Sequence, residues 1–445
     1  MTRLSRGNSV HSDRWLLDLV DAAGPLPDSL LALREAGVEF ELTEVWQPYE
    51  SRTRDGAWRE RDRVDPRIAR DLERLLRNVR LLRVKTAVAG GADLVDKFGA
   101  DPLVRTADVV PSREFCGTAR RVRRDASWHL DAIRWHVARR LPDFRDAADI
   151  QVAILDSGLD SRHPDMRRLE PIAALDPFDH ASRPPRDRMG HGTHTAGIVL
   201  GDRKTKFGLR GMCAARIEAH SIVDPVPAAA DEPQRLEYAV DERRYLAALI
   251  RAIESRADIV HLGVASLGGP TFLDRALFEL ARELSVVVVA PIGNFRQHDD
   301  PPTWAARIHD VIGVGASSID DQPAPFSSRT ADTTILAPGV AIWSAAPTFA
   351  GEVGFDLVRN AKGRLQRRAR PRPQRVMCLD GTSAAAAQVT AAVALLFASR
   401  GKDSPGRVRD ALRTTAWHRK GSRGAHEAEN SGLPGVLDVA ALLTN

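Results

Sequence analysis

The chain has 445 residues, 43% of them hydrophobic and 28% charged, which is typical of a soluble globular protein with room for more than one core. Its 64 Lys and Arg against 59 Asp and Glu give a net charge of +5, and because many arginines stand near acidic residues, this excess does not by itself indicate a nucleic-acid partner. Its three cysteines, Cys116, Cys213 and Cys378, are odd in number and widely spaced, which excludes a disulfide framework and a CxxC metal site.

Neither a secretory signal nor a membrane span is expected. Met1–Arg6 leads into polar sequence rather than an apolar stretch. The longest apolar run, Ala384–Ser399, is interrupted by polar residues and is shorter than the ~20 residues that a spanning helix needs, so it predicts a buried helix. Together with the cysteine pattern, which fits a reducing compartment, these features predict a cytoplasmic protein without a membrane partner.

Residues 1–125 are rich in Arg, Asp and Glu and predict a small α+β unit. A helix is expected from Asp65 as N-cap and Pro66 as first helical residue, with apolar residues at helical spacing after it. A strand over Leu81–Val88, a short helix over Ala92–Phe98 and a strand over Leu103–Val110 should follow.

From Gln151 onward, short apolar strands alternate with helical stretches. Nearly continuous apolar strands separated by helices favour a parallel sheet covered on both faces. The fold class is therefore α/β, a mostly parallel sheet with helices on both faces, over 127–445. The expected strands are 151–155, 257–262, 286–290, 311–315 and 334–337, and the expected helices include 242–256 and 273–284.

The stretch 351–375 carries seven arginines and two prolines. A solvated surface insertion or hairpin is the favoured interpretation, and recognition of an acidic partner is the alternative. Because Phe355 is its one aromatic residue, the stacking platforms for single-stranded nucleic acid are missing, and a nucleic-acid partner is not expected.

Three segments combine the residue types needed for nucleophilic catalysis: a hydroxyl, a base that takes its proton and an acid that orients the base. Asp156 follows the first strand, and the carboxyl ends of parallel strands are where catalytic groups gather. His191 lies in Gly-His-Gly-Thr-His, where a helix begins, and Ser383 lies in Gly-Thr-Ser-Ala-Ala at the start of the Ala-rich helix. Each segment alone is weak evidence, but their conjunction in the order Asp, His, Ser is strong.

These blocks resemble the three signature blocks of subtilisin-like serine proteases, over roughly residues 127–445. Val286–Ala290 followed by Gly293-Asn294 is similar to the strand and turn that carry the family's oxyanion-hole asparagine. The resemblance implies a serine endopeptidase in which Ser383 attacks, His191 is the base, Asp156 orients it and Asn294 donates to the oxyanion. It leaves His194 a structural role.

Where the family usually has Met and then Pro-His after the nucleophile, this chain has Ala384 and Ala387-Gln388. Many relatives bind calcium after the histidine helix, but Gly201–Gly208 holds three cations and one carboxylate, and Asp165 lacks obvious partners. We therefore expect neither a metal nor a cofactor.

The family's substrate-binding strand can be matched in two registers. Gly263-Val264-Ala265 is favoured over Ser266-Leu267-Gly268 because the strand length then fits. Gly293 would line the opposite side of the pocket, and no charge is expected there.

The unit at 1–125 has two interpretations: a propeptide-like segment that is cleaved off, or a permanently attached recognition domain. For the whole chain, an active endopeptidase acting on protein or peptide substrates is favoured. A catalytically idle binding scaffold, or a protease with an added surface for acidic partners or nucleic acid, is the alternative.

Overall fold

The computed structural model describes residues 14–45, 66–85, 91–115, 118–119, 127–166, 187–200, 210–227, 236–267, 269–297, 303–304, 307–359, 365–417 and 434–445.

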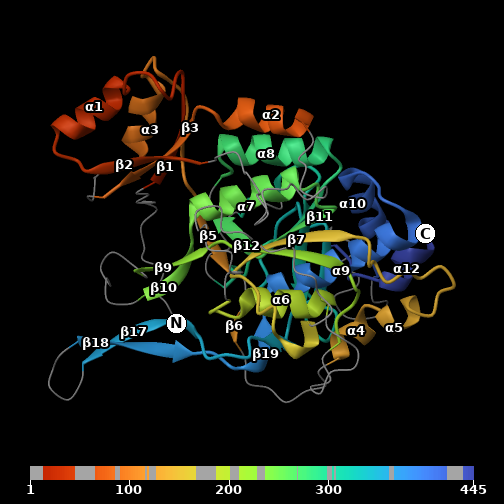
Figure 1. Ribbon diagram of the computed structural model, residues 1–445. Helices are drawn as coiled ribbons and strands as arrows, with labels where there is room; N and C mark the ends of the chain where they lie inside the picture. Colours follow the sequence, from red (N-terminus) through yellow and green to blue (C-terminus); the bar gives the residue numbers. More distant parts are fainter. Residues whose placement is uncertain are drawn as a thin grey trace, which may run out of the picture.

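A six-stranded parallel sheet forms the centre of the protein (Figure 1), in the order β15-β14-β13-β11-β7-β8. This confirms the predicted α/β class. The five predicted strands are present, and β8 joins them at one edge. The strands are β7 (Gln151–Asp156), β8 (Arg216–Ser221), β11 (Ile259–Leu262), β13 (Val287–Pro291), β14 (Ile312–Ser317) and β15 (Ile335–Pro338).

Alternate residues of these strands enter two cores, which explains why their sequences are apolar throughout. Val152 and Ile154 of β7 pack in the core that contains α6 and α9, whereas Ala153 and Leu155 pack in the core that contains α7 and α8. The helices on the first side are α4 (Trp128–Ala132), α5 (Trp135–Ala138), α6 (His191–Leu200), α9 (Thr382–Arg400), α10 (Pro405–Thr414) and α12 (Val439–Thr444), and those on the second are α7 (Glu242–Glu254) and α8 (Phe272–Glu283).

Helix α9 is long and apolar enough to span a membrane, with a mean hydropathy of 1.5 over its most apolar window, but 89% of that window is buried inside the protein. It is a core helix, as the sequence predicts. Its alanines let it contact β13 and β14 closely.

The N-terminal unit has its own four-stranded antiparallel sheet, in the order β2-β3-β1-β4. One face packs on α1 and α3, and the other shares a core with α2 and α7. Helix α2 contacts α7 and is drawn next to α8 in Figure 1, so the unit rests on the second face of the larger domain, residues 127–445. Its elements are β1 (Arg14–Leu19), α1 (Asp28–Glu35), β2 (Phe40–Glu44), α2 (Pro66–Leu76), β3 (Val79–Val84), α3 (Gly91–Gly99) and β4 (Val104–Val109).

Elements β1, α1 and β2 are not predicted by the sequence patterns, and β3 begins earlier than the predicted strand. Residue 65 and residues 86–88, in the predicted helix cap and strand end, lie outside the described residues. Strand β1 was missed because both of its faces are buried: Trp15 and Leu17 point into the unit's own core and Leu16 into the shared core, so the strand shows no alternation.

After β4, the N-terminal segment crosses onto the larger domain. Strand β5 (Ser112–Phe115) pairs antiparallel with β12 (Val264–Leu267), and β6 (Thr118–Ala119) pairs antiparallel with β19 (Arg375–Asp380). Strand β19 also pairs with β16 (Ile342–Ala346). The last residues of the predicted unit are therefore parts of sheets that the larger domain completes.

The arginine-rich stretch forms the predicted hairpin, β17 (Glu352–Arg359) and β18 (Leu365–Pro371), which joins β10 (Leu236–Val240) and β9 (Val223–Pro227) in a second sheet. The prediction of a solvated stretch is wrong for Arg372. It is buried, and its guanidinium donates to the carbonyl oxygens of Arg188, Pro347, Phe349 and Pro373 at 2.6–3.2 Å. A short 3-10 turn (Pro164–Met166) completes the described elements.

Candidate active site

Asp156, His191 and Ser383 come together from three elements. Asp156 is the last residue of β7, His191 is the first of α6, and Ser383 is the second of α9. Such positions at the carboxyl ends of parallel strands are where open α/β sheets gather their functional groups.

The three side chains form a continuous hydrogen-bonded chain. His191 Nδ1 lies 2.8 and 2.9 Å from the two carboxylate oxygens of Asp156, and His191 Nε2 lies 2.9 Å from Ser383 Oγ. A carboxylate can only accept, so Nδ1 carries a proton, and the neutral imidazole then presents Nε2 as the acceptor for the serine hydroxyl. This is the geometry of a nucleophile activated by an oriented base.

Burial and charge act in opposite directions on this pair. Burial lowers the pKa of His191, but the adjacent Asp156 carboxylate outweighs it and raises that pKa above its ordinary value. Burial raises the pKa of Asp156, but His191 and the N–H of Ser157, which donates to Asp156 Oδ1 at 2.6 Å, bring it below its ordinary value. Asp156 therefore stays ionised and stabilises an imidazolium.

Asn294 lies in the turn after β13, beside the start of α9. Its Oδ1 accepts two hydrogen bonds from Thr382, one from the backbone N–H and one from the hydroxyl, both at 3.0 Å. Because a backbone N–H can only donate, Oδ1 must face Thr382, which leaves Nδ2 as a donor next to Ser383. Gly293 has a φ of 102°, which gives glycine an advantage at this turn.

Asp187 is a buried residue that sequence analysis missed. Its Oδ1 accepts from Ser157 Oγ and from the N–H of Gly190, and its Oδ2 accepts from the N–H of Thr193, each at 2.7 Å. Burial raises its pKa, against the hydrogen bonds that lower it. Asp187 thus joins the residue after Asp156 to the start of α6, which carries His191.

Two further buried histidines are held as neutral structural groups. His194 Nε2 lies 3.0 Å from the carbonyl oxygen of Ile342, and burial lowers its pKa to about 3. His261 Nδ1 lies 2.9 Å from Thr390 Oγ1, and burial lowers its pKa to about 4. Of these three histidines, His191 has its pKa raised and contacts a serine.

Gly263, the first of the predicted substrate-binding residues, packs against the triad. A Cβ on Gly263 would come within 2.1 Å of Asp156 Oδ2, so this position accepts glycine alone. Val264 and Ala265 begin β12, and Ser266 and Leu267 continue it, so one strand contains most of both alternative registers. Gly268 lies outside the described residues.

The departures after Ser383 have a structural consequence. Gln388 is buried in α9 and its Nε2 donates to the carbonyl oxygen of Pro338 at 2.6 Å, which ties the nucleophile helix to the end of β15.

Cys378 is buried on β19, and burial raises the pKa of Cys213 to about 12.

No group of three or more metal-ligating side chains is found among the residues that the structure describes. The loop Gly201–Gly208, on which the calcium prediction depends, lies outside them.

A parallel α/β sheet with a Ser-His-Asp chain at its carboxyl edge is an arrangement found in serine hydrolases. The chain belongs to the Subtilase family (peptidase S8), whose sequence model matches residues 147–436.

Among its relatives, Subtilisin E of Bacillus subtilis (strain 168) is 27% identical over 274 residues, which are 60% of this chain and 61% of that protein. The major intracellular serine protease of the same organism is 27% identical over 208 residues, 45% of this chain and 60% of that protein. The chain thus spans about three fifths of the length of these relatives.

A solved structure with the same fold is that of fervidolysin from Fervidobacterium pennivorans, a keratinolytic enzyme related to subtilisin. Its TM-score to this chain is 0.63 at 20% identity, and the match covers 98% of this chain and 61% of that one. This likeness extends the shared fold beyond the residues that the family model matches.

Proposed function

We propose that the protein is a serine endopeptidase that hydrolyses peptide bonds of protein or peptide substrates through an acyl-enzyme. The observation that carries this proposal is the hydrogen-bonded chain Asp156–His191–Ser383 with Asn294 beside it. An idle scaffold would have no physical need for a base that is held in one tautomer against a serine.

In the proposed reaction, Ser383 Oγ attacks the scissile carbonyl carbon while His191 Nε2 takes its proton. The oxyanion accepts from Asn294 Nδ2 and from the Ser383 N–H, and the N-terminal end of α9 adds the favourable end of its macrodipole. His191 then gives the proton to the leaving amine. Water attacks the acyl-enzyme carbonyl carbon while His191 takes the proton of the water, and His191 returns that proton to Ser383 Oγ as the acyl group leaves. These steps use side chains and water and require no cofactor.

A serine-directed phosphonate probe tests the proposal. The folded wild-type chain should gain one probe mass on Ser383, and Ser383→Ala should gain none by intact mass. Ser404→Ala is a control, because Ser404 is an exposed serine whose side chain does not cap α10, and this variant should keep the label on Ser383. An unlabelled wild type that is folded by circular dichroism would contradict the assignment.

We also propose that the N-terminal unit is propeptide-like and covers the cleft until it is cleaved. Strand β5 lies along β12, the strand expected to bind substrate, and Thr118 of β6 pairs with Asp380, three residues before Ser383. Because the residues on both sides of this stretch pair with strands next to the site, the first self-cleavage is expected between residues 115 and 118.

N-terminal sequencing of the isolated protein tests this role. A new terminus between residues 115 and 118, absent in Ser383→Ala, is the expected result. A wild-type protein that reacts with the probe and keeps its original terminus would instead favour a permanently attached recognition domain.

A further inference from the structure

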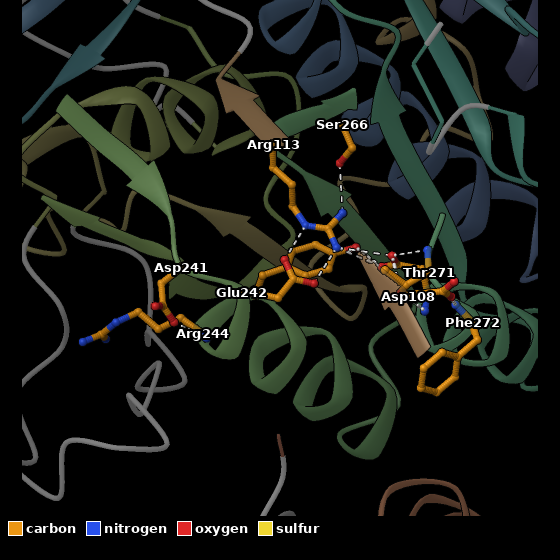
Figure 2. Close-up of polar contacts among 10 residues, drawn as sticks. Asp108, Arg113, Asp241, Glu242, Arg244, Ser266, Thr271 and Phe272 are labelled. Atoms are coloured by element: carbon orange, nitrogen blue, oxygen red, sulfur yellow. Dashed lines mark hydrogen bonds and ion pairs between the residues drawn. The ribbon is translucent and has the colours of Figure 1, made fainter. Parts of the chain in front are cut away.

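Strand β5 buries one guanidinium inside the larger domain (Figure 2). The Arg113 side chain is 1% exposed. Its Nε and Nη2 donate to the two carboxylate oxygens of Glu242 at 2.9 and 2.8 Å, and Nη2 also reaches Asp274 at 3.2 and 3.3 Å. Nη1 donates to Ser266 Oγ at 2.9 Å. Each of the three guanidinium nitrogens thus donates at least one hydrogen bond to a side-chain oxygen.

Two aromatic rings complete the walls of this pocket. The guanidinium carbon lies 3.8 Å from the ring centroid of Tyr245 and 4.9 Å from that of Trp304. Aromatic faces attract a delocalised planar cation, and Arg stacks on them better than Lys does. Although burial alone lowers the pKa of Arg113, the carboxylates of Asp274 and Glu242 raise it above its ordinary value, so the group is charged.

Among the residues that the structure describes, every group that contacts the guanidinium belongs to the larger domain. Glu242 begins α7, Ser266 is in β12, and Asp274 is in the first turn of α8. Asp274 is fixed independently, because it forms a capping box with Thr271. The pocket is therefore built without β5, and the N-terminal strand supplies its occupant.

Without a cation, the pocket is unfavourable. The side chains of Glu242 and Asp274 are 2% and 0% exposed, and removing Arg113, the cation that bonds both of these buried carboxylates, costs several kcal/mol. When β5 leaves, another cation of the same shape is favoured in its place.

The pairing register places the pocket relative to the triad. Arg113 lies opposite Ser266, and β12 starts after Gly263, which packs against Asp156. A substrate strand in this register would present to Ser383 the residue opposite Gly263. The residue opposite Ser266 is three positions earlier, the fourth before the cleaved bond.

We propose that Glu242, Asp274, Ser266, Tyr245 and Trp304 form an arginine-selective subsite, and that the substrates are extended peptides with Arg at the fourth residue before the cleaved bond. This rests on the proposed endopeptidase function. Arg113 occupies the subsite in the way that a substrate arginine does, and lysine fits less well because it cannot bond both carboxylates in a fixed plane.

Matched quenched-fluorescent peptides that differ only in Arg, Lys or Leu at this position test the subsite on the wild-type protein after self-cleavage has removed the N-terminal unit, because Arg113 occupies the pocket in the uncleaved chain. The Arg peptide should exceed the Leu peptide in kcat/KM by about 30-fold or more, the scale expected for a buried charge pair. Glu242→Gln should reduce that ratio about tenfold. Glu254→Gln, a change of another buried glutamate at the far end of α7, should leave the ratio unchanged.

A second measurement needs no catalysis. In the chain carrying Arg113→Ala and Ser383→Ala, N-acetyl-arginine amide should raise the thermal midpoint more than N-acetyl-lysine amide does, because it occupies the vacated pocket. If Arg113→Ala does not fold, the rates of the Arg, Lys and Leu peptides with the wild-type protein decide whether the pocket is an arginine subsite.

The outcomes separate the two proposals. A Ser383 that no probe labels overturns the endopeptidase function. A labelled Ser383 with equal rates for the Arg and Leu peptides overturns the subsite alone and leaves Arg113 as a fixed structural ion pair.

Discussion

Asp187→Asn is expected to destabilise the site, because an amide cannot replace this carboxylate. The two oxygens of Asp187 accept from three donors on opposite sides. An Asn in either orientation turns an N–H₂ group toward a donor, so either the N–H of Thr193 or that of Gly190 loses its acceptor. The Ser157 hydroxyl can rotate, but a backbone N–H cannot.

The expected cost is about 1–3 kcal/mol, the penalty for leaving one buried donor unsatisfied. Because Asp187 joins the segment after Asp156 to the start of α6, loss of order there should also lower kcat, by at most about 100-fold if the whole cost falls on the transition state. Asp187 is a positioning residue, so KM should change little.

The assay is urea unfolding followed by tryptophan fluorescence, in a Ser383→Ala background that prevents self-cleavage. The matched control is Asp241→Asn. Asp241 is the N-cap of α7, where its side chain accepts from the N–H of Arg244, and Asn caps helices about as well as Asp. If the two variants unfold at the same urea concentration, the role assigned to Asp187 is wrong.

Three further predictions concern the triad. Asp156→Asn should lower kcat about 10⁴-fold through the wrong histidine tautomer. Asp156 raises the pKa of His191, and the base works when unprotonated, so activity of the wild type should rise with pH through a pKa above 6.5. In Asp156→Asn the same rise in activity should occur at lower pH. A pH–rate profile in which the rise does not move would show that Asp156 is not what raises the pKa of His191. Asn294→Ala should lower kcat about 10²–10³-fold with little change in KM, and an equal change in both constants would argue against an oxyanion role. Gly263→Ala should abolish phosphonate labelling because its Cβ would collide with Asp156, whereas Gly269→Ala, which meets nothing within 4 Å, should label normally.

The reacting groups could be located from the sequence alone because each one lies in a motif of residues that are adjacent in the chain. Asp156 ends a continuous apolar strand, and His191 and Ser383 stand among small residues at helix starts, so each motif is readable within ten residues. The parallel sheet was also predictable, because strands buried on both faces are apolar throughout.

Tertiary structure decided what links distant segments. Ser157 and Asp187 are 30 residues apart, and Arg113 lies 129 residues from Glu242 and 161 from Asp274, so no local pattern marks these bonds. Arg372 shows the same limit: in sequence it is one of seven arginines in the charged stretch 351–375, yet in the fold it is buried against four carbonyl oxygens. A hydrogen bond between buried groups depends on where the chain returns in space, and only the packed structure fixes that.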